Sequence, residues 1–346
     1  MSDINIRIQG RAGRITLTRP KALNALTYDM ISAVEAALDT WRDDDRVALV
    51  LIDGAGERAF CAGGDIAQLY KTGTAGSYGY GRQFWRDEYR MNDKIARYPK
   101  PVISFLHGFV MGGGVGIGCH GSHRVVCENS QIAMPECGIG LVPDVGGAYL
   151  LARAPGRLGE YLGLTGARMG PDGAILSQFA THYVPQAQWP DLVSELIDSG
   201  SPDALQAAAM PPPPGRIIAV RQQIDHHFAA PDLAGILASL RGDDGEFATD
   251  ALKLVMRNSP LSMGATLSII DRLRQQGPTL RGALELEFRY VFRTMEHGDF
   301  LEGIRAAIID KDRNPTWRQQ HDALTQADID FMLAPLGDQA LRFEEE

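Results

Sequence analysis

Cysteine is scarce in this sequence. Its 346 residues include four cysteines, namely Cys61, Cys119, Cys127 and Cys137. Their spacing matches no zinc-ligand pattern, and a chain of this length can bury enough surface to fold without disulfides. We therefore expect four buried, reduced thiols and no metal site, as in a protein of a cytoplasmic-type compartment.

Long apolar runs and blocks of like charge are also missing. No stretch reaches the roughly 20 apolar residues that a membrane-spanning helix needs, and the first residues lack the pattern of a secretory signal. The formal net charge is -9, without the basic stripe that binding to nucleic acid or to an acidic lipid surface requires. The sequence thus predicts a cytoplasmic protein with neither nucleic acid nor membrane among its partners.

The first part of the chain alternates between strand and helix patterns. The apolar run over 47–53 predicts a strand buried on both faces, as in the parallel sheet of an α/β protein. Thr27 is placed to cap a helix that runs to Trp41. The other elements expected here are two strands within 4–18, strands at 101–106 and 123–127, and a helix at 82–97.

The pattern changes after about residue 190 to one helix after another. The expected helices are 187–199, 216–228, 246–257, 262–276, 280–296 and 299–308. Four consecutive prolines at 211–214 form a stiff connection between them. We expect an α/β core over residues 1–200 that carries the active site, and a helical region over 201–346. Residues 72–81, TGTAGSYGYG, are expected to form a flexible lid.

Two glycine-rich turns follow two of the predicted strands, at 60–66 and 107–116. A turn from a strand into a helix leaves backbone N–H groups without an internal partner. Two such turns side by side can aim two N–H groups at one oxygen, which is the arrangement of an oxyanion hole. The alternative is that the glycines only permit tight packing between strand and helix.

A second glycine pattern, G-x-G-x-x-G at 116–121, does not indicate a dinucleotide site. That fingerprint requires its first glycine at the end of a strand, whereas Gly116 lies within a run expected to be helical. There is no nucleophile-elbow or phosphate-loop motif. His120 and His123 are three residues apart without a further ligand, so we interpret them as surface or structural residues. No cofactor is expected.

Two carboxylates stand out in the segment 133–150, AMPECGIGLVPDVGGAYL. Glu136 and Asp144 each follow a proline, and the residues between them are otherwise apolar, glycine or cysteine. Burial raises the proton affinity of a carboxylate, and two neighbouring carboxylates push their affinities apart, so one can act as base and the other as acid. The structural alternatives are a helix N-cap or a salt-bridged core acid for Glu136, and a helix N-cap for Asp144.

These motifs together resemble the crotonase (enoyl-CoA hydratase/isomerase) superfamily. The resemblance includes the two glycine turns, the proline–glutamate pair with the following G-G-x-x-L, and RPKALNALTYDM at 19–30. It implies an α/β fold, a spiral of ββα repeats followed by C-terminal helices. It also implies an acyl-CoA substrate, with coenzyme A as part of the substrate, and a homo-oligomer that is a trimer or a hexamer.

The resemblance also assigns roles to single residues. Gly64 and Gly113 would supply the two N–H groups that hold the thioester oxygen, and Glu136 and Asp144 would be the acid–base pair. The implied substrate-binding residues are Ala22, Leu23, Ala25, Ala62, Asp65, Ile66 and Gly112. Arg19 and Lys21 would either meet the coenzyme phosphates or be solvated at the surface.

Within the superfamily, the segments 107–125, 134–153 and 296–317 are most similar to the 3-hydroxyisobutyryl-CoA hydrolases. Hydratases of the superfamily carry a second glutamate where this chain has Gly116, and usually a glycine where it has Asp144. This difference favours hydrolysis of a short branched β-hydroxyacyl-CoA, as in valine breakdown. The alternatives are an enoyl-CoA hydratase or isomerase, and a non-catalytic acyl-CoA-binding protein.

The third segment contains charged residues that do not enter this assignment. Glu302, Arg305, Asp310 and Lys311 are expected to form structural ion pairs rather than a part of the active site.

Overall fold

The computed structural model describes residues 3–343. They form two compact units, and the chain passes repeatedly from one unit to the other. Unit 1 consists of Met1–Asp65, Asp87–Ala133 and Arg168–Ile218, and unit 2 of Ile66–Arg86, Met134–Ala167 and Ala219–Glu346. The units therefore interleave, which differs from the two consecutive regions 1–200 and 201–346 that the sequence predicts. The difference arises because two early segments belong with the C-terminal helices.

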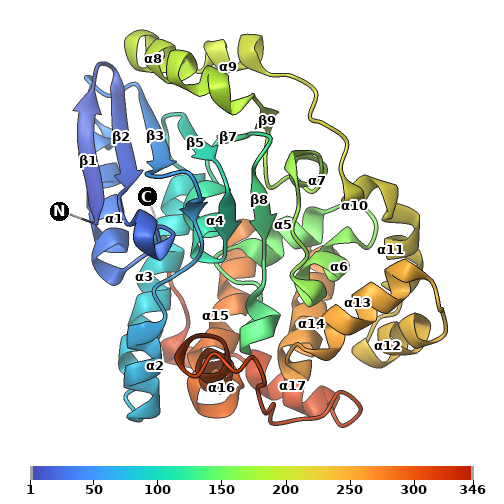
Figure 1. Cartoon of the computed structure of the whole chain (residues 1–346). Helices are drawn as coiled ribbons and strands as arrows, with labels where there is room; N and C mark the ends of the chain where they lie inside the picture. Colours follow the sequence, from blue (N-terminus) through green and yellow to red (C-terminus); the bar gives the residue numbers. More distant parts are fainter. Residues whose placement is uncertain (1–2, 344–346) are drawn as a thin grey trace. The chain divides into compact units, whose positions relative to one another are not determined.

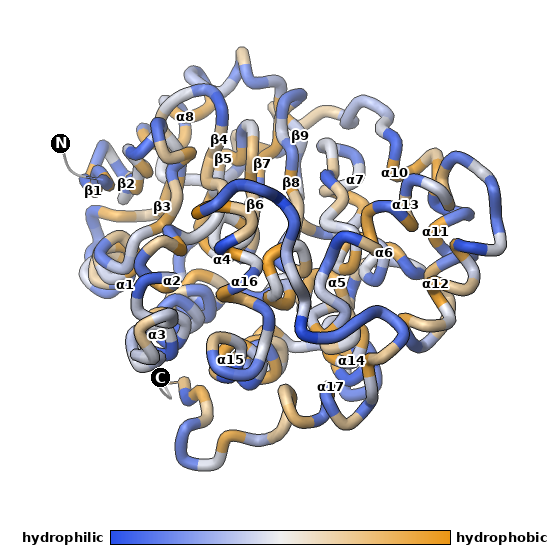
Figure 2. The backbone as a smooth tube through the Cα atoms, turned by 60° about the horizontal axis from the view of Figure 1, so that its bottom comes forward, coloured by the Kyte–Doolittle hydropathy of each residue, from blue (hydrophilic) through white to orange (hydrophobic). Residues whose placement is uncertain are grey.

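All nine strands in the described residues belong to unit 1. The larger sheet has the order β1-β2-β3-β5-β7-β9, in which β1 is antiparallel to β2 and the other neighbours are parallel (Figure 1). Its strands are β1 (Ile4–Gln9), β2 (Ala12–Leu17), β3 (Leu49–Gly54), β5 (Val102–Leu106), β7 (His123–Val126) and β9 (His182–Tyr183). The central strands β3 and β5 are strongly hydrophobic, as expected for strands covered on both faces (Figure 2).

A second, parallel sheet contains three short strands, β4 (Ala59–Cys61), β6 (Phe109–Met111) and β8 (Gln131–Ala133). From β3 onward, successive strands alternate between the two sheets, so that β3 and β4, β5 and β6, and β7 and β8 form three similar pairs. The helix α4 (Gly113–Gly118) follows the second pair. This arrangement confirms the predicted α/β fold with ββα repeats.

Helices of unit 1 cover the larger sheet. The helix α1 (Tyr28–Arg42) begins where predicted, because the Thr27 side chain accepts a hydrogen bond from the Met30 N–H. The helices α8 (Trp189–Ser199) and α9 (Asp203–Ala208) lie over the sheet in Figure 1, and α7 (Pro171–Leu176) precedes them. Leu49, Leu51, Ile103 and Phe105 from the strands share one hydrophobic cluster with Trp189, Leu192 and Leu196 of α8. Each fully buried leucine contributes about 2 kcal/mol to such a core.

The regular elements in the described residues of unit 2 are all helices. Its elements include α2 (Ala67–Thr74), η2 (Glu136–Ile139), α5 (Gly147–Arg153), α6 (Leu158–Thr165), α11 (Arg221–His227), α12 (Leu233–Arg241), α13 (Glu246–Met256), α14 (Pro260–Gln276), α15 (Leu280–His297), α16 (Phe300–Ile304) and α17 (Gln326–Leu333). The early helix α5 packs against both α14 and α15. Two helices contain residues of both units, namely α3 (Gly79–Ala96) and α10 (Arg216–Ala219). No helix within 3–343 is both long and apolar enough to cross a lipid bilayer.

The segment 72–81 contains the end of one helix, a turn and the start of the next helix, and the flexible lid expected there stays a prediction. The helix α2 ends at Thr74 and α3 begins at Gly79. The glycines on either side pack closely within unit 2. A Cβ on Gly73 would lie 2.6 Å from Leu301 Cδ2, and a Cβ on Gly81 would lie 1.8 Å from Met295 Cε. Gly73 and Gly81 therefore serve close helix packing, whereas a Cβ on Gly76 or Gly79 would meet nothing within 4 Å.

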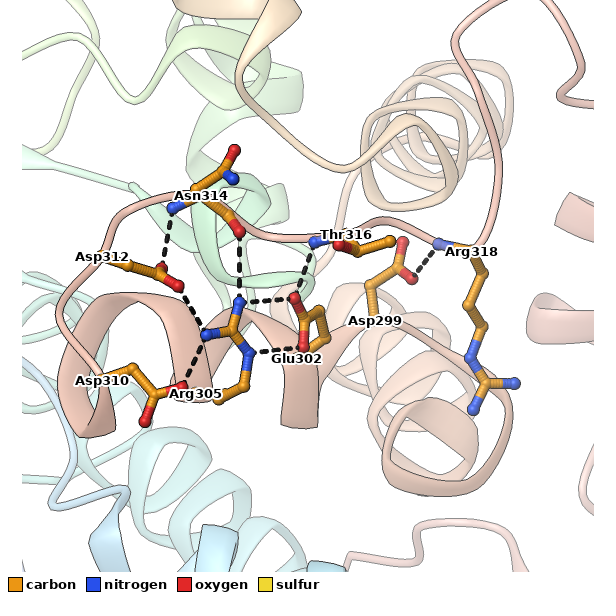
Figure 3. Close-up of polar contacts among 8 residues, drawn as sticks. All are labelled: Asp299, Glu302, Arg305, Asp310, Asp312, Asn314, Thr316 and Arg318. Carbon is orange, nitrogen blue, oxygen red and sulfur yellow. Dashed lines mark hydrogen bonds and ion pairs between the residues drawn. The ribbon is translucent and has the colours of Figure 1, made fainter.

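An arginine-centred network follows α16 (Figure 3). The helix continues as a π-helical turn, η4 (Arg305–Ile309). Arg305 pairs with Glu302 at 2.8 Å and with both Asp310 and Asp312 at 2.7 Å. This confirms the predicted ion pairing of Glu302, Arg305 and Asp310. Within residues 3–343 Lys311 forms no ion pair, so the prediction is wrong for this residue, which takes a left-handed backbone conformation with φ 58°. The network joins the helix end to the extended chain that follows it.

Candidate active site

Gly64 lies in the loop that follows β4 in unit 1. The neighbouring segment holds this loop through two backbone bonds, from Leu26 N–H to Gly63 C=O at 2.9 Å and from Asp65 N–H to Leu26 C=O at 2.7 Å. These two bonds engage the carbonyl of Gly63 and the N–H of Asp65, on either side of Gly64. Within residues 3–343, the N–H of Gly64 itself donates to no other group. Gly63 has φ 124°, a conformation that only glycine adopts readily.

Gly113 is the first residue of α4, so its N–H has no partner within the helix. Gly112 before it has φ 50° and ψ -121°, which also requires glycine. The third glycine permits close packing, because a Cβ on Gly114 would lie 2.1 Å from Cys61 C=O. A Cβ on Gly113 would lie 3.3 Å from Gly64 N. The two predicted amide donors are therefore neighbours, although their role as an oxyanion hole stays a prediction.

The predicted substrate-binding residues of unit 1 lie on the loops around these amides. Ala22, Leu23 and Ala25 are on the turn that follows β2, and Leu23 has φ 51°. The N–H of Ala62 donates to Leu23 C=O at 3.0 Å, which brings the two loops together. The side chain of buried Asn24 donates to the carbonyls of Ala55 and Ala59, each at 2.9 Å, and so fixes the turn. Ile66 is the N-cap of α2 and is counted in unit 2.

Arg19 has a structural role in this region. Its guanidinium donates to Ala25 C=O at 2.6 Å and to Asp65 at 3.0 Å, and it also pairs with Asp3 at 3.3 Å. It thereby links the turn after β2 to the loop after β4. Lys21 is exposed. The coenzyme contact considered for both residues stays untested.

A third carboxylate, Glu88 of α3, was missed by the sequence interpretation. Its side chain is 3% exposed, and its Oε1 lies 2.9 Å from the position that a Cβ on Gly113 would take. Burial raises the pKa of the nearby Cys61 thiol to about 12, and the charge of Glu88 adds to this shift. A sequence signal does exist, because Glu88 falls on the same helical stripe as the apolar residues Trp85 and Tyr89.

Glu136 and Asp144 are both in unit 2 and both 4% exposed. Glu136 opens the short helix η2, whose N-cap is Pro135, so Glu136 is not an N-cap. Asp144 precedes Val145 and Gly146, which have φ 53° and 79°. The N-cap of α5 is Gly146, without a side-chain cap, so the N-cap alternative for Asp144 is also wrong. Sharp turns therefore present both acids in a buried setting.

The turn that carries Asp144 is held by Glu287 of α15, a second residue that sequence reasoning missed. The fully buried carboxylate accepts hydrogen bonds from Gly146 N–H at 2.8 Å and from Ala148 N–H at 3.0 Å. Burial raises the pKa of Glu287 well above its ordinary value, and the charge of Asp144 raises it further. Glu287 thus positions the backbone on both sides of the start of α5.

The four cysteines are free and buried, as predicted. Burial raises the pKa of Cys61, Cys119 and Cys137 to about 12, so these thiols stay protonated at neutral pH and are poor nucleophiles. Within the described residues, no three His, Cys, Asp or Glu side chains gather in a way that could hold a metal ion. Gly116 lies inside α4, so the strand-end context of a dinucleotide fingerprint does not apply to it.

A family model described as enoyl-CoA hydratase/isomerase matches residues 12–333 of this chain. The chain is 36% identical to the mitochondrial 3-hydroxyisobutyryl-CoA hydrolase of Gallus gallus, over 99% of this chain and 91% of that protein. It is 38% identical to the mitochondrial 3-hydroxyisobutyryl-CoA hydrolase of Danio rerio, over 92% of this chain and 85% of that protein.

Two solved structures are similar over the whole chain. One is described as an enoyl-CoA hydratase from Rhodobacter sphaeroides, with 54% identity and a TM-score of 0.94, covering 99% of this chain and 100% of that one. The other is described as a carnitinyl-CoA dehydratase from Mycobacterium thermoresistibile, with 41% identity and a TM-score of 0.95, covering 100% of both chains. The relatives thus agree on acyl-CoA chemistry and carry names for different reactions.

Proposed function

The chain belongs to the enoyl-CoA hydratase/isomerase family, and we propose that within this family it is a thioester hydrolase. The proposed substrate is a short branched β-hydroxyacyl-CoA, namely 3-hydroxyisobutyryl-CoA, and the products are 3-hydroxyisobutyrate and coenzyme A. The names of the 36–38% identical relatives support this assignment. The observation that carries it is Gly116, which stands inside α4 where a hydratase needs its second glutamate.

In the proposed reaction, the thioester oxygen accepts hydrogen bonds from the N–H groups of Gly64 and Gly113. Their neighbouring positions in unit 1 support this role. Both donors are held in place by the backbone before substrate arrives, so they stabilise the developing negative charge without reorganisation. The proposal requires that the same thioester also reaches Glu136 of unit 2.

Glu136 supplies the nucleophilic step by one of two routes. In the first route it takes a proton from a water whose oxygen attacks the carbonyl carbon; in the second its own carboxylate attacks, and water then opens the mixed anhydride. In both routes the C–S bond breaks and the sulfur leaves as a thiolate. Asp144 either donates a proton to this thiolate or binds the substrate's hydroxyl, in which case the thiolate takes its proton from water. The buried setting of both acids supports this division of roles.

We assign Glu88 to the β-hydroxyl of the substrate, because its carboxylate lies beside Gly113 in unit 1. The E88Q variant should raise KM for 3-hydroxyisobutyryl-CoA about tenfold or more, since a hydrogen bond to a charged group contributes roughly 1.5–3 kcal/mol. The KM for isobutyryl-CoA, which lacks the hydroxyl, should change little. Equal effects on both substrates would contradict the assignment.

A second candidate function, hydration of an enoyl-CoA, is favoured by the description of the 54% identical Rhodobacter sphaeroides structure. A third candidate is an acyl-CoA-binding protein without catalysis. A thiol-reactive dye combined with the absorbance of the crotonyl-CoA double bond separates the three, because only hydrolysis releases free coenzyme A and only hydration removes the double bond. The proposed hydrolase releases thiol from 3-hydroxyisobutyryl-CoA; a hydratase consumes crotonyl-CoA without releasing thiol, and a binding protein turns over neither substrate.

A further inference from the structure

The buried residue Asp299 packs against the turn that begins at Glu136, and both residues belong to unit 2. Gly140 ends this turn, and its N–H donates to Glu136 C=O. Leu141 N–H donates to the same carbonyl at 3.0 Å. A Cβ on Gly140 would lie 2.4 Å from the backbone carbonyl carbon of Asp299, so only glycine permits this approach. The backbone of Glu136 is therefore tied to a turn in direct contact with Asp299.

The side chain of Asp299 does not have the role that its position in the chain predicts. Asp299 is at the N-cap position of α16, where an aspartate usually accepts a hydrogen bond from the first turn of the helix, but it makes no such bond. Its two oxygens accept instead from Ser259 Oγ at 2.6 Å and from Arg318 N–H at 2.9 Å, the second of which is drawn in Figure 3.

The setting of this carboxylate is also costly. Asp299 is 1% exposed, and within residues 3–343 it forms no ion pair. Burial of a charged group without a counter-ion is unfavourable unless hydrogen bonds compensate it. Both compensating bonds lead away from α16, to the start of α14 and to the chain after η4. Capping of α16 therefore does not account for an aspartate at this position.

Ser259 connects Asp299 to the residue that follows Glu136. It is the N-cap of α14, and its hydroxyl accepts from Ser262 N–H at 3.2 Å. The hydroxyl proton is donated to Asp299, which leaves the lone pairs of Oγ for the helix. The N–H of Ser259 donates to Cys137 C=O at 2.9 Å. Asp299 thus orients Ser259, and Ser259 holds the carbonyl next to Glu136 in the chain.

Two hydroxyl groups of α15 hold the other end of the same turn. Thr294 Oγ1 donates to Gly140 C=O at 3.2 Å, and Tyr290 OH donates to this oxygen at a longer 3.4 Å. Both side chains are fully buried. The turn of Glu136 is therefore fixed at its start through Ser259 and at its end through Gly140, and Asp299 touches both of these points.

We propose that Asp299 is a positioning residue, which holds the turn of Glu136 so that this carboxylate is aligned with the thioester. The inference rests on the proposed function of Glu136. A displacement of about 1 Å can cost roughly 10² in rate when reacting groups must be aligned. The proposed amide donors, Gly64 and Gly113, are in unit 1, so loss of Asp299 disturbs the alignment of the acid and leaves those donors in place.

The test compares full-length wild type with D299N, which keeps the shape of the side chain. An amide offers one acceptor oxygen and a donor nitrogen, so D299N cannot accept both hydrogen bonds. We expect kcat for thiol release from 3-hydroxyisobutyryl-CoA to fall by roughly 10–10²-fold, with KM within about twofold of the wild type. S259A removes the same link from the other side and should have the same effect. The control D338N changes an exposed aspartate and should alter neither constant.

Amide hydrogen exchange gives a second readout that does not depend on the reaction. The N–H groups of Gly138, Gly140 and Leu141 close the turn, and their exchange should become about threefold faster or more in D299N and S259A. If the wild type released no thiol, the proposed hydrolysis would fail, whereas exchange would still decide the positioning role: faster exchange would support it and unchanged exchange would overturn it.

With measurable thiol release, wild-type kcat in D299N and S259A would overturn the proposal, and S259A alone decides if D299N does not fold. A lower melting temperature with an unchanged kcat would show that Asp299 only stabilises the fold, which also contradicts a positioning role. A higher KM at unchanged kcat would assign Asp299 to substrate binding instead, with the same consequence.

Discussion

At the scale of single residues, backbone conformation determines where the reactive groups lie. Gly63 and Gly112 have positive φ values of 124° and 50°, and each directly precedes a residue whose N–H is the proposed donor to the thioester oxygen. Val145 is an exception, because it is not glycine and still has φ 53°, directly after Asp144. Such a conformation costs about 1–3 kcal/mol for a β-branched residue and persists only where the surroundings enforce it.

The first residue-scale prediction concerns Gly113. In G113A the new methyl group would lie 3.3 Å from Gly64 N and 2.9 Å from Glu88 Oε1, so it would crowd the proposed position of the thioester oxygen. Because loss of one oxyanion donor typically costs roughly 10²–10³ in rate, kcat for thiol release should fall by about that factor. The matched control is G79A, where a Cβ meets nothing within 4 Å. A G113A enzyme that keeps more than about a tenth of wild-type kcat contradicts the assigned role.

A second residue-scale prediction follows from the raised pKa of Glu287. The folded protein retains this proton at pH values where the unfolded chain has released it, above about pH 4.3. As pH rises above that value, this residue therefore lowers the free energy of unfolding, by up to about 1.4 kcal/mol per pH unit, until the folded-state pKa is passed. E287Q cannot titrate and lacks this term, so the advantage of the wild type over E287Q should shrink between pH 5 and pH 8.

Urea denaturation at four pH values in that range measures this difference. The control is E285Q, which changes an exposed glutamate on the same helix and should give a pH profile parallel to that of the wild type. Parallel profiles for E287Q and the wild type would show that Glu287 does not hold its proton in the folded state.

At the scale of elements, the sequence predicts best those helices and strands that are long and whose apolar residues follow a clear pattern. The helices α1, α8, α14 and α15 and the strands β3 and β5 lie where the sequence predicts them, because their apolar residues recur over several turns or fill a continuous run. The strands β4, β6 and β8 have three residues each, too few for any period to be visible. The glycines of 72–81 indicate a loop locally, but packing against α15 and α16 makes most of that segment helical.

The sequence predicts those residues of the candidate site that lie in recognisable motifs. Gly64, Gly113, Glu136 and Asp144 occur in recognisable local patterns, whereas Glu88 and Glu287 lie in ordinary helical sequence. Their importance becomes visible only when the fold brings Glu88 beside Gly113 and Glu287 beside the turn of Gly146. Those contacts join residues far apart in sequence, and no local period encodes them.

The element-scale prediction concerns the chain after η4. Arg305 holds this segment through Asp310, Asp312 and the carbonyl of Asn314 (Figure 3). In R305Q these contacts are lost, and amide hydrogen exchange over residues 310–318 should become roughly threefold faster or more, because local opening requires less free energy. The control R313Q removes a charge from an exposed side chain of the same segment and should leave exchange unchanged. Equal exchange in both variants would mean that the arginine network does not order this segment.

At the scale of the whole molecule, the chain is divided differently from what composition suggests. The change from strands to helices after β9 is visible in the sequence, but the segments Ile66–Arg86 and Met134–Ala167 belong with the late helices in one compact unit. The proposed chemistry draws amide donors from unit 1 and two acids from unit 2. All of these groups lie in the first half of the sequence, but the unit that carries the two acids is completed by the C-terminal helices, so the proposal needs the complete chain.

Two whole-molecule properties stay predictions. The homo-oligomer, a trimer or hexamer, is expected from the superfamily resemblance alone. The cytoplasmic location is an expectation from composition, while the curated relatives are named as mitochondrial proteins.

The measurement that tests the central claim most directly is thiol release, followed with a thiol-reactive dye and the purified full-length protein. With 3-hydroxyisobutyryl-CoA we predict one free thiol for each carboxylate formed, and with crotonyl-CoA we predict no thiol release. The rate of thiol release should fall by a factor of roughly 10²–10⁴ in E136Q, whereas the control E195Q should keep wild-type activity. Loss of the crotonyl-CoA double bond without thiol release, or an E136Q enzyme with near wild-type turnover, would contradict it.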